Sequence, residues 1–144
     1  MNVTYMLDTN TVTYIVKRQS EHARQKLLKY SEEDDVCISA ITEAEIRYGL
    51  AKRKLSFETQ AAIEQFLAKI DVLPWDSAAA KEYGTARASL ERAGKPLANM
   101  DLLIAAHAAA AGAVLVTNDN GFDGRFEHFN LKATVNWADD WQKS

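Results

Sequence analysis

The chain has 144 residues, of which 47% are hydrophobic and 26% are charged, and its formal net charge is −3. These values fit one globular domain and exclude a strongly basic surface, so any contact with nucleic acid must depend on local patches or on metal ions. The sequence has no apolar run long enough to cross a membrane, no signal-peptide pattern and a single cysteine, Cys37. We therefore expect one domain over residues 1–144 and a cytoplasmic location.

Strand-like and helical segments alternate along the chain. The segments expected to form strands are 3–8, 36–40, 71–74 and 113–117, and 133–136 is a candidate fifth. Helices are expected at about 10–18, 22–30, 42–54, 57–70, 77–94 and 100–112, with caps at Thr42, Ser56, Asp76 and Asn99. This alternation predicts an α/β fold in which helices cover both faces of a central parallel sheet of four to five strands.

Four carboxylates are predicted to meet at one edge of that sheet. Asp8 ends the first strand in "YMLDTN", and Asp119 follows the fourth strand in "VLVTND". Glu45 and Asp101 lie in the expected first turns of two helices. Ligand sites of parallel sheets lie outside the carboxyl ends of the strands, where the helices also begin. The topology therefore brings acids from four separate segments together.

Such a cluster points to metal-dependent chemistry on phosphates. Crowded carboxylates repel one another unless a cation neutralises them, and oxygen ligands suit Mg²⁺ or Mn²⁺. These ions activate water and stabilise the charge of a reacting phosphodiester. Each acid alone also has a structural explanation, namely a helix cap for Asp8, a helix dipole for Asp101, a turn for Asp119, and a capping box with Thr42 for Glu45. The prediction therefore depends on the four acids together.

Four motifs in this order resemble those of the PIN-domain ribonucleases, specifically the VapC-type toxins of toxin–antitoxin pairs. The motifs are "MLDTN", "ITEAEIRYG", "NMDLLIAAHA" and "VLVTND", and the resemblance extends over nearly the whole chain. It implies a PIN fold and a divalent-metal endoribonuclease that cuts structured RNA, in several relatives tRNA. It also implies that Asp8, Glu45, Asp101 and Asp119 are the catalytic and metal-binding residues. A small VapB-type antitoxin and a homodimer are the implied partners.

Other residues are candidates for supporting roles. Asn10 and Thr117 are placed to orient Asp8 and Asp119 by hydrogen bonds, and a turn role is an equal alternative. Lys95 precedes the Asp101 helix and is the best candidate for an RNA phosphate contact, although a solvated helix face also explains it. His107, on the alanine-rich helix, is expected to be a packed histidine.

Glu43 and Glu45 compete for the second acid position. They lie about 200° apart around a helix, so only one of them can face the acid cluster. Glu43 is four residues before Arg47, the spacing of an exposed ion pair. The helical geometry therefore selects Glu45.

Two other functions compete with the nuclease. A haloacid-dehalogenase-type phosphatase also begins with a strand that ends in paired acids, and "DTNTV" comes near that motif, but Asn10 replaces the second acid. A non-catalytic binding module of the same fold is the other alternative, and the presence of all four acids argues against it. Phosphate-monoester hydrolysis would indicate the phosphatase, whereas RNA cleavage that is lost with EDTA would indicate the nuclease.

Overall fold

The structure is a computed structural model that describes residues 2–118 and 124–140. Within these residues five strands form one sheet in the order β3-β2-β1-β4-β5, and every neighbouring pair is parallel. The strands are β1 (Thr4–Leu7), β2 (Asp35–Ser39), β3 (Asp71–Leu73), β4 (Val114–Val116) and β5 (Thr134–Val135). The predicted parallel α/β sheet is confirmed, and the candidate fifth strand is one of its two edge strands.

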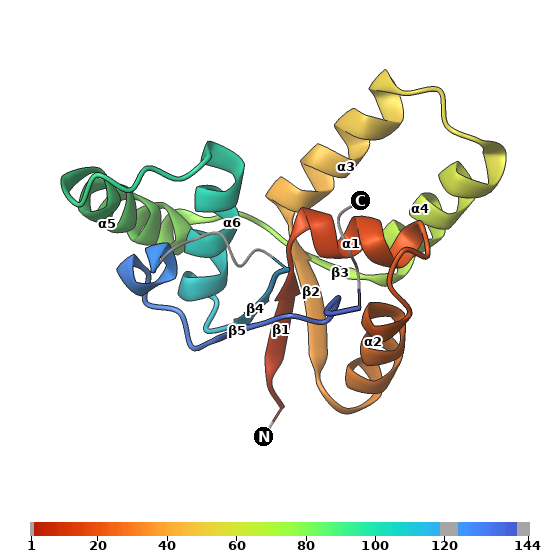
Figure 1. Cartoon of the computed structure of the whole chain (residues 1–144), viewed down its shortest axis with the longest axis horizontal. Coiled ribbons are helices and arrows are strands. Elements are labelled where there is room, and N and C mark those ends of the chain that lie inside the picture. The colour runs from red at the N-terminus through yellow and green to blue at the C-terminus, as the bar shows by residue number, and fades with distance from the viewer. Residues whose placement is uncertain (1, 119–123, 141–144) are drawn as a thin grey trace.

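Helices cover both faces of this sheet (Figure 1). They are α1 (Thr9–Val16), α2 (Glu21–Glu33), α3 (Ala40–Lys52), α4 (Phe57–Lys69), α5 (Ser77–Arg92) and α6 (Asn99–Ala110), followed by the short 3-10 helix η1 (Arg125–His128). Figure 1 shows α5 and α6 on one side of the strands and α1, α2 and α4 on the other, while α3 projects away from the sheet. None of the helices in the described segments has the length and apolar character that a bilayer-spanning helix needs.

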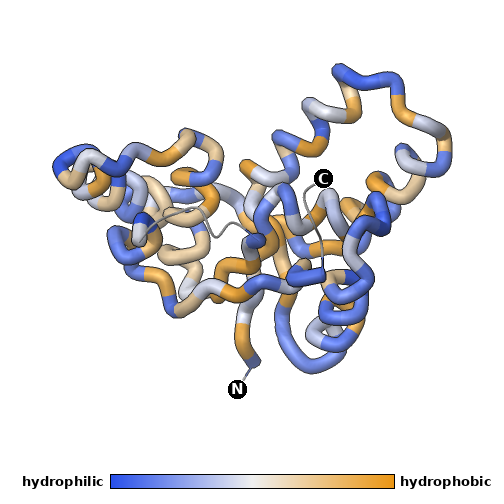
Figure 2. The backbone as a smooth tube through the Cα atoms, viewed as in Figure 1, coloured by the Kyte–Doolittle hydropathy of each residue, from blue (hydrophilic) through white to orange (hydrophobic). Residues whose placement is uncertain are grey.

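The strands are apolar on both faces, as expected when helices cover a parallel sheet on both sides. Met6 and Cys37 point into the core under α5 and α6, whereas Leu7 and Ile38, one residue further along each strand, point into the core under α1, α2 and α4. Figure 2 shows the apolar residues concentrated on the strands and on the inner sides of the helices, with hydrophilic residues on the outer turns. Two separate cores therefore hold the helices against one sheet.

The predicted caps at Ser56 and Asp76 are confirmed, because each side chain accepts a hydrogen bond from the third residue that follows it. The helix that carries Asp101 ends as predicted near Gly112, which takes a left-handed φ of 65°.

Two predicted caps are wrong. Strand β2 leads directly into α3, so the hydroxyl of Ser39 accepts the Ile41 N–H at 3.1 Å, and Thr42 lies fully buried inside the first turn. Helix α6 begins after Ala98, which has no capping side chain, and Asn99 is its first helical residue. The negative charge of Asp101 in that first turn compensates in part, because it interacts favourably with the helix dipole.

Candidate active site

Asp8 lies at the junction of β1 and α1, at the carboxyl edge of the sheet. Its backbone N–H donates to the carbonyl of Val116 on β4 at 3.0 Å, which extends the β1–β4 pairing by one residue. Its Oδ1 accepts the Thr11 N–H at 2.8 Å, so Asp8 is also the N-cap of α1. The capping explanation for Asp8 is therefore correct. It does not compete with a role in binding, because the cap bond involves one carboxylate oxygen and fixes where the group points.

Asp101 approaches Asp8 from α6. The two acids line the same small pocket together with Thr117, and the apolar walls come from Ile104, Leu115 and Phe126. The pocket has a volume of about 10 Å³, close to the space that one bound water molecule occupies. Asp101 is exposed and lies in the first turn of α6. Figure 1 shows that α1, α3 and α6 all begin on the same side of the sheet.

Glu45 reaches the same corner of the molecule from α3. Its Oε1 accepts a hydrogen bond from the Thr9 hydroxyl at 2.6 Å, and Thr9 is the residue directly after Asp8. The predicted capping box with Thr42 is wrong, because Ser39 caps α3 and Glu45 lies beyond the first turn, which contains Glu43. Glu43 instead forms the predicted ion pair with Arg47, at 3.0 Å.

The other predicted residues lie around this corner. Thr117 is buried at the end of β4 and faces the pocket that Asp8 and Asp101 share. Asn10 is exposed and lines the groove next to Glu45, and the cap bond of Asp8 comes from the Thr11 N–H. Asp119 lies outside the described residues, so its position in the cluster stays a prediction.

Lys95 lies on the connection between α5 and α6, on the side of the shared pocket. A methyl group at Gly124 would be 3.7 Å from its Nζ, which places the ammonium beside the start of η1. Arg125 of η1 donates to the carbonyl of Pro96 at 3.1 Å, and Phe126 lines the acid pocket. The location is compatible with a phosphate contact, which stays a prediction.

Two hydroxyl side chains that the motifs did not indicate also lie at this site. Thr9 holds Glu45, and Thr11 donates through its Oγ1 to the carbonyl of Val116 at 3.3 Å. Both follow Asp8 in "DTNT", and a run of hydroxyl residues directly after a strand-ending acid is the signal that could have identified them.

A third missed contact links two of the acid-bearing helices. The Nδ1 of His107 on α6 lies 2.7 Å from Oγ of Ser39, the cap of α3. Because the Ser39 oxygen already accepts the Ile41 N–H, its own O–H is free to donate to a neutral His107. Burial lowers the pKa of His107, and the negative charge of Asp76 opposes this in part. The packed histidine predicted at this position is confirmed, and its contact joins the helices that carry Asp101 and Glu45.

Comparison with known proteins identifies the family of the chain. Residues 5–125 match the PIN domain family. The chain belongs to the PIN-domain family. Within it, this PIN domain is 35% identical to a tRNA(fMet)-specific endonuclease VapC of Shigella flexneri over 93% of the chain and 98% of the relative. It is 38% identical to the protein of the same name from Salmonella typhimurium over 80% of the chain and 86% of the relative. The chain is thus a member of the VapC ribonucleases.

A solved structure gives the same assignment. The crystal structure of VapBC2 from Rickettsia felis, bound to a DNA fragment from its promoter, superposes on this PIN domain with a TM-score of 0.83 and 32% identity. The match covers 94% of the chain and 99% of the matched chain. The resemblance inferred from the four motifs is therefore confirmed for the family and the fold.

Proposed function

We propose that the chain is the toxin of a toxin–antitoxin pair and hydrolyses structured RNA at the corner where Asp8, Glu45 and Asp101 meet. The observation that carries this proposal is the pocket shared by Asp8 and Asp101, with Glu45 held beside it through Thr9. VapC membership favours a nuclease over the phosphatase alternative. By the same resemblance the products carry a 5′-phosphate and a 3′-hydroxyl.

The chemistry of the donor atoms at this corner suits Mg²⁺ or Mn²⁺, whereas the ligand atoms of Asp8, Glu45 and Asp101 do not all lie within 4.8 Å of one another. Asp8, Glu45 and Asp101 supply only carboxylate oxygens, the ligands that these hard cations prefer, and we place Asp119 with them as the fourth acid. When bound, such an ion neutralises the clustered acids and lowers the pKa of a water molecule for attack on phosphorus.

The surrounding residues hold these acids in place before any substrate arrives. Thr11 fixes the Asp8 carboxylate through its N–H, and Thr9 fixes Glu45 through its hydroxyl. Asp101 is held by an α-helix whose inner face is buried. Groups fixed in this way need little reorganisation when charge develops on the phosphate, and this preorganisation is a main source of rate enhancement.

We infer that the substrate is a tRNA. This inference comes from the relatives of Shigella flexneri and Salmonella typhimurium, whose names give tRNA(fMet) as their substrate. An initiator tRNA is thus the first candidate to test against a mixed tRNA pool.

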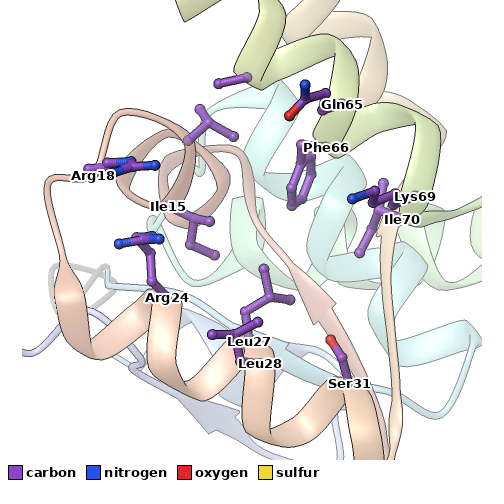
Figure 3. Close-up of a pocket in the computed structure, with 12 residues that line it drawn as sticks. Ile15, Arg18, Arg24, Leu27, Leu28, Ser31, Gln65, Phe66, Lys69 and Ile70 are labelled. Atoms are coloured by element: carbon purple, nitrogen blue, oxygen red, sulfur yellow. The ribbon is translucent and has the colours of Figure 1, made fainter.

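We further propose that a small VapB-type antitoxin binds the groove between α1, α2 and α4. The groove has a volume of about 510 Å³. Figure 3 shows apolar side chains such as Ile15, Leu27 and Phe66 within it, and Arg18 and Arg24 near its edge. An amphipathic helix with acidic flanks is the complementary ligand. VapBC assemblies among the structural relatives support a partner of this kind.

Cleavage of a tRNA pool by the purified chain tests the proposed activity. We expect EDTA to stop cleavage, and Mg²⁺ or Mn²⁺ to restore it. Asp8→Asn is the sharpest variant, because asparagine still offers an oxygen to the Thr11 N–H and so keeps the helix cap but loses the charge. Cleavage should fall by at least about 100-fold, with an unchanged melting temperature. An Asp8→Asn variant that cleaves like the unaltered chain would contradict the proposal.

A further inference from the structure

A second groove opens beside the acid pocket, between the facing sides of α1 and α3. It has a volume of about 330 Å³. Its two walls are lined by residues that recur every three or four positions: Thr9 and Thr13 on α1 with Lys17, the residue that caps its end, and Glu45, Tyr48 and Lys52 on α3. Because this spacing keeps side chains on one face of a helix, both walls run from the acid corner toward the far ends of the helices.

The charge changes sign along this groove. The Glu45–Thr9 hydrogen bond lies at the inner end, next to Asp8, whereas Lys17, Lys52 and Arg53 line the outer end. None of these three bases forms an ion pair with a carboxylate in the part of the chain that the structure describes. Figure 2 shows the end of α3 as hydrophilic. In a chain with a net charge of −3, unpaired cations gathered beside an acidic site indicate an anionic ligand.

An exposed aromatic ring lies between the two ends. Tyr48 is 64% exposed, although burial of a large ring is favourable. The Nζ of Lys52 lies 5.4 Å from the centre of this ring. A ring next to an ammonium group can contact a base through the ring and the adjoining phosphate through the cation.

Gly49, which also lines the groove, has no evident packing role. It lies in the interior of α3, where glycine costs up to about 1 kcal/mol relative to alanine. A Cβ at this position would meet nothing within 4 Å, so no neighbour among the described residues requires a glycine here. Because Gly49 has no side chain, the groove has more room for a ligand at this position.

We propose that the α1–α3 groove binds the single-stranded nucleotides next to the phosphate that is cut, with Tyr48 stacking on a base and Lys17, Lys52 and Arg53 contacting phosphates. This inference rests on the proposed ribonuclease function. Glu45 and Lys52 are separated by about 10 Å along a helix that rises 1.5 Å per residue. At about 3.4 Å per stacked nucleotide, the groove accommodates two to three nucleotide steps.

RNA affinity, measured without cleavage, tests this groove. The Asp101→Asn variant serves as the background, and fluorescein-labelled oligoadenylate and oligouridylate serve as probes. Tyr48→Ala should raise the Kd about 10-fold, the scale of one base–aromatic stack, and Tyr48→Phe should change it less than about twofold. The matched control is Phe57→Ala, which removes a ring that is 83% exposed but lies outside this groove, and it should leave the Kd unchanged.

The salt dependence of binding tests the lysines. Lys52→Ala should reduce the slope of log K against log salt concentration by about 0.7, the value for one phosphate contact on a single strand. Lys54→Ala removes an exposed lysine two residues away that does not line the groove, and should leave the slope unchanged. Gly49→Ala should raise the melting temperature but weaken RNA binding, which separates folding from ligand binding.

Three results would overturn the inference: equal slopes for Lys52→Ala and Lys54→Ala, a Kd unchanged by Tyr48→Ala, or no RNA binding by the background variant. Loss of antitoxin co-purification in Tyr48→Ala with unchanged RNA affinity would assign the groove to a protein instead. Failure of the proposed function would show separately, as absence of cleavage by the unaltered chain.

Discussion

The two faces of the sheet are covered by helices that pack in different ways. On the face covered by α5 and α6 the core is rich in alanine, with Ala86, Ala105, Ala106, Ala108 and Ala109 all buried. On the other face, larger side chains of α1 and α4, such as Ile15 and Ile63, form the core. The alanine face borders the small acid pocket, whereas the other face borders the grooves of about 510 and 330 Å³.

This difference assigns separate tasks to the two faces. Alanine lets helix and sheet backbones approach closely, and a close-packed interface tolerates little movement. Helix α6 therefore holds Asp101 in a fixed position relative to Asp8, which directly follows β1. The helices of the other face leave grooves between them, where we propose that an RNA strand and an antitoxin helix bind. Helix α3 belongs to both, because Ile41 packs against the alanine-rich core and Ile46 against the other core.

Glu45 is the residue through which α3 joins the acid site, and its substitution should have the largest effect. Glu45→Gln keeps an acceptor oxygen for the Thr9 hydroxyl but removes the charge. We expect cleavage to fall by about 100-fold or more, with a melting temperature within a few degrees of the unaltered chain. Glu43→Gln, two residues away, breaks only the exposed pair with Arg47 and should leave cleavage nearly intact. Normal cleavage by Glu45→Gln beside an inactive Glu43→Gln variant would reverse our assignment.

Enlarging one alanine on each face tests the packing difference directly. Ala106→Leu forces extra carbons into a fully buried position, and should destabilise the fold by about 1–3 kcal/mol. Thermal unfolding should show this as a melting temperature lower by roughly 5–10 °C. Ala62→Leu places the same carbons at the α1–α2–α4 groove, so it should change stability little but weaken antitoxin co-purification. Equal melting temperatures for the two variants would show that the alanine face is not tightly packed.

Much of this architecture is predictable from the sequence because it depends on local patterns. The β-branched runs identified the strands, the helical periodicity identified the helices, and Ser56 and Asp76 were recognisable caps. The start of α3 was not predictable in this way, since Ser39 and Thr42 are both good caps. In the folded chain Ser39 forms the cap, and its hydroxyl also contacts His107, which is distant in the sequence. Similarly, the Thr9–Glu45 bond joins residues 36 positions apart, a contact that spacing along one segment cannot reveal.

The two sides of the molecule also differ in how their histidines titrate, which gives the smallest expected effect. Buried His107, beside Ser39 and Asp76, has a pKa lowered from 6.5 by burial. Exposed His22, at the start of α2, has a pKa raised from 6.5 by its hydrogen bond to Asp139 and by the charge of Asp140, with Lys26 opposing. The pKa of His107 lies below the ordinary histidine value and the pKa of His22 lies above it. The two histidines therefore change the free energy of unfolding in opposite directions as the pH changes.

For His107, the unfolded chain binds the proton more readily than the folded chain. Its contribution to stability is therefore complete above about pH 6.5 and is lost as the pH falls toward the lowered pKa. For His22 the folded chain binds the proton more readily, so its contribution is present below about pH 6.5 and is lost as the pH rises through the raised pKa. Because the His22 pair is exposed, salt should screen it, whereas burial protects the His107 effect from screening.

Chemical denaturation between about pH 7.5 and 5.5 at high salt should therefore isolate the loss of stability due to His107. His107→Asn keeps an acceptor near the position of Nδ1 for the Ser39 hydroxyl but cannot titrate, so its unfolding free energy should fall less on acidification. His22→Asn is the matched control on the other side, and at high salt it should follow the unaltered chain. If His107→Asn loses as much stability on acidification as the unaltered chain, the acid sensitivity lies elsewhere. The Ser39–His107 contact would then join α3 and α6 without making that junction sensitive to pH.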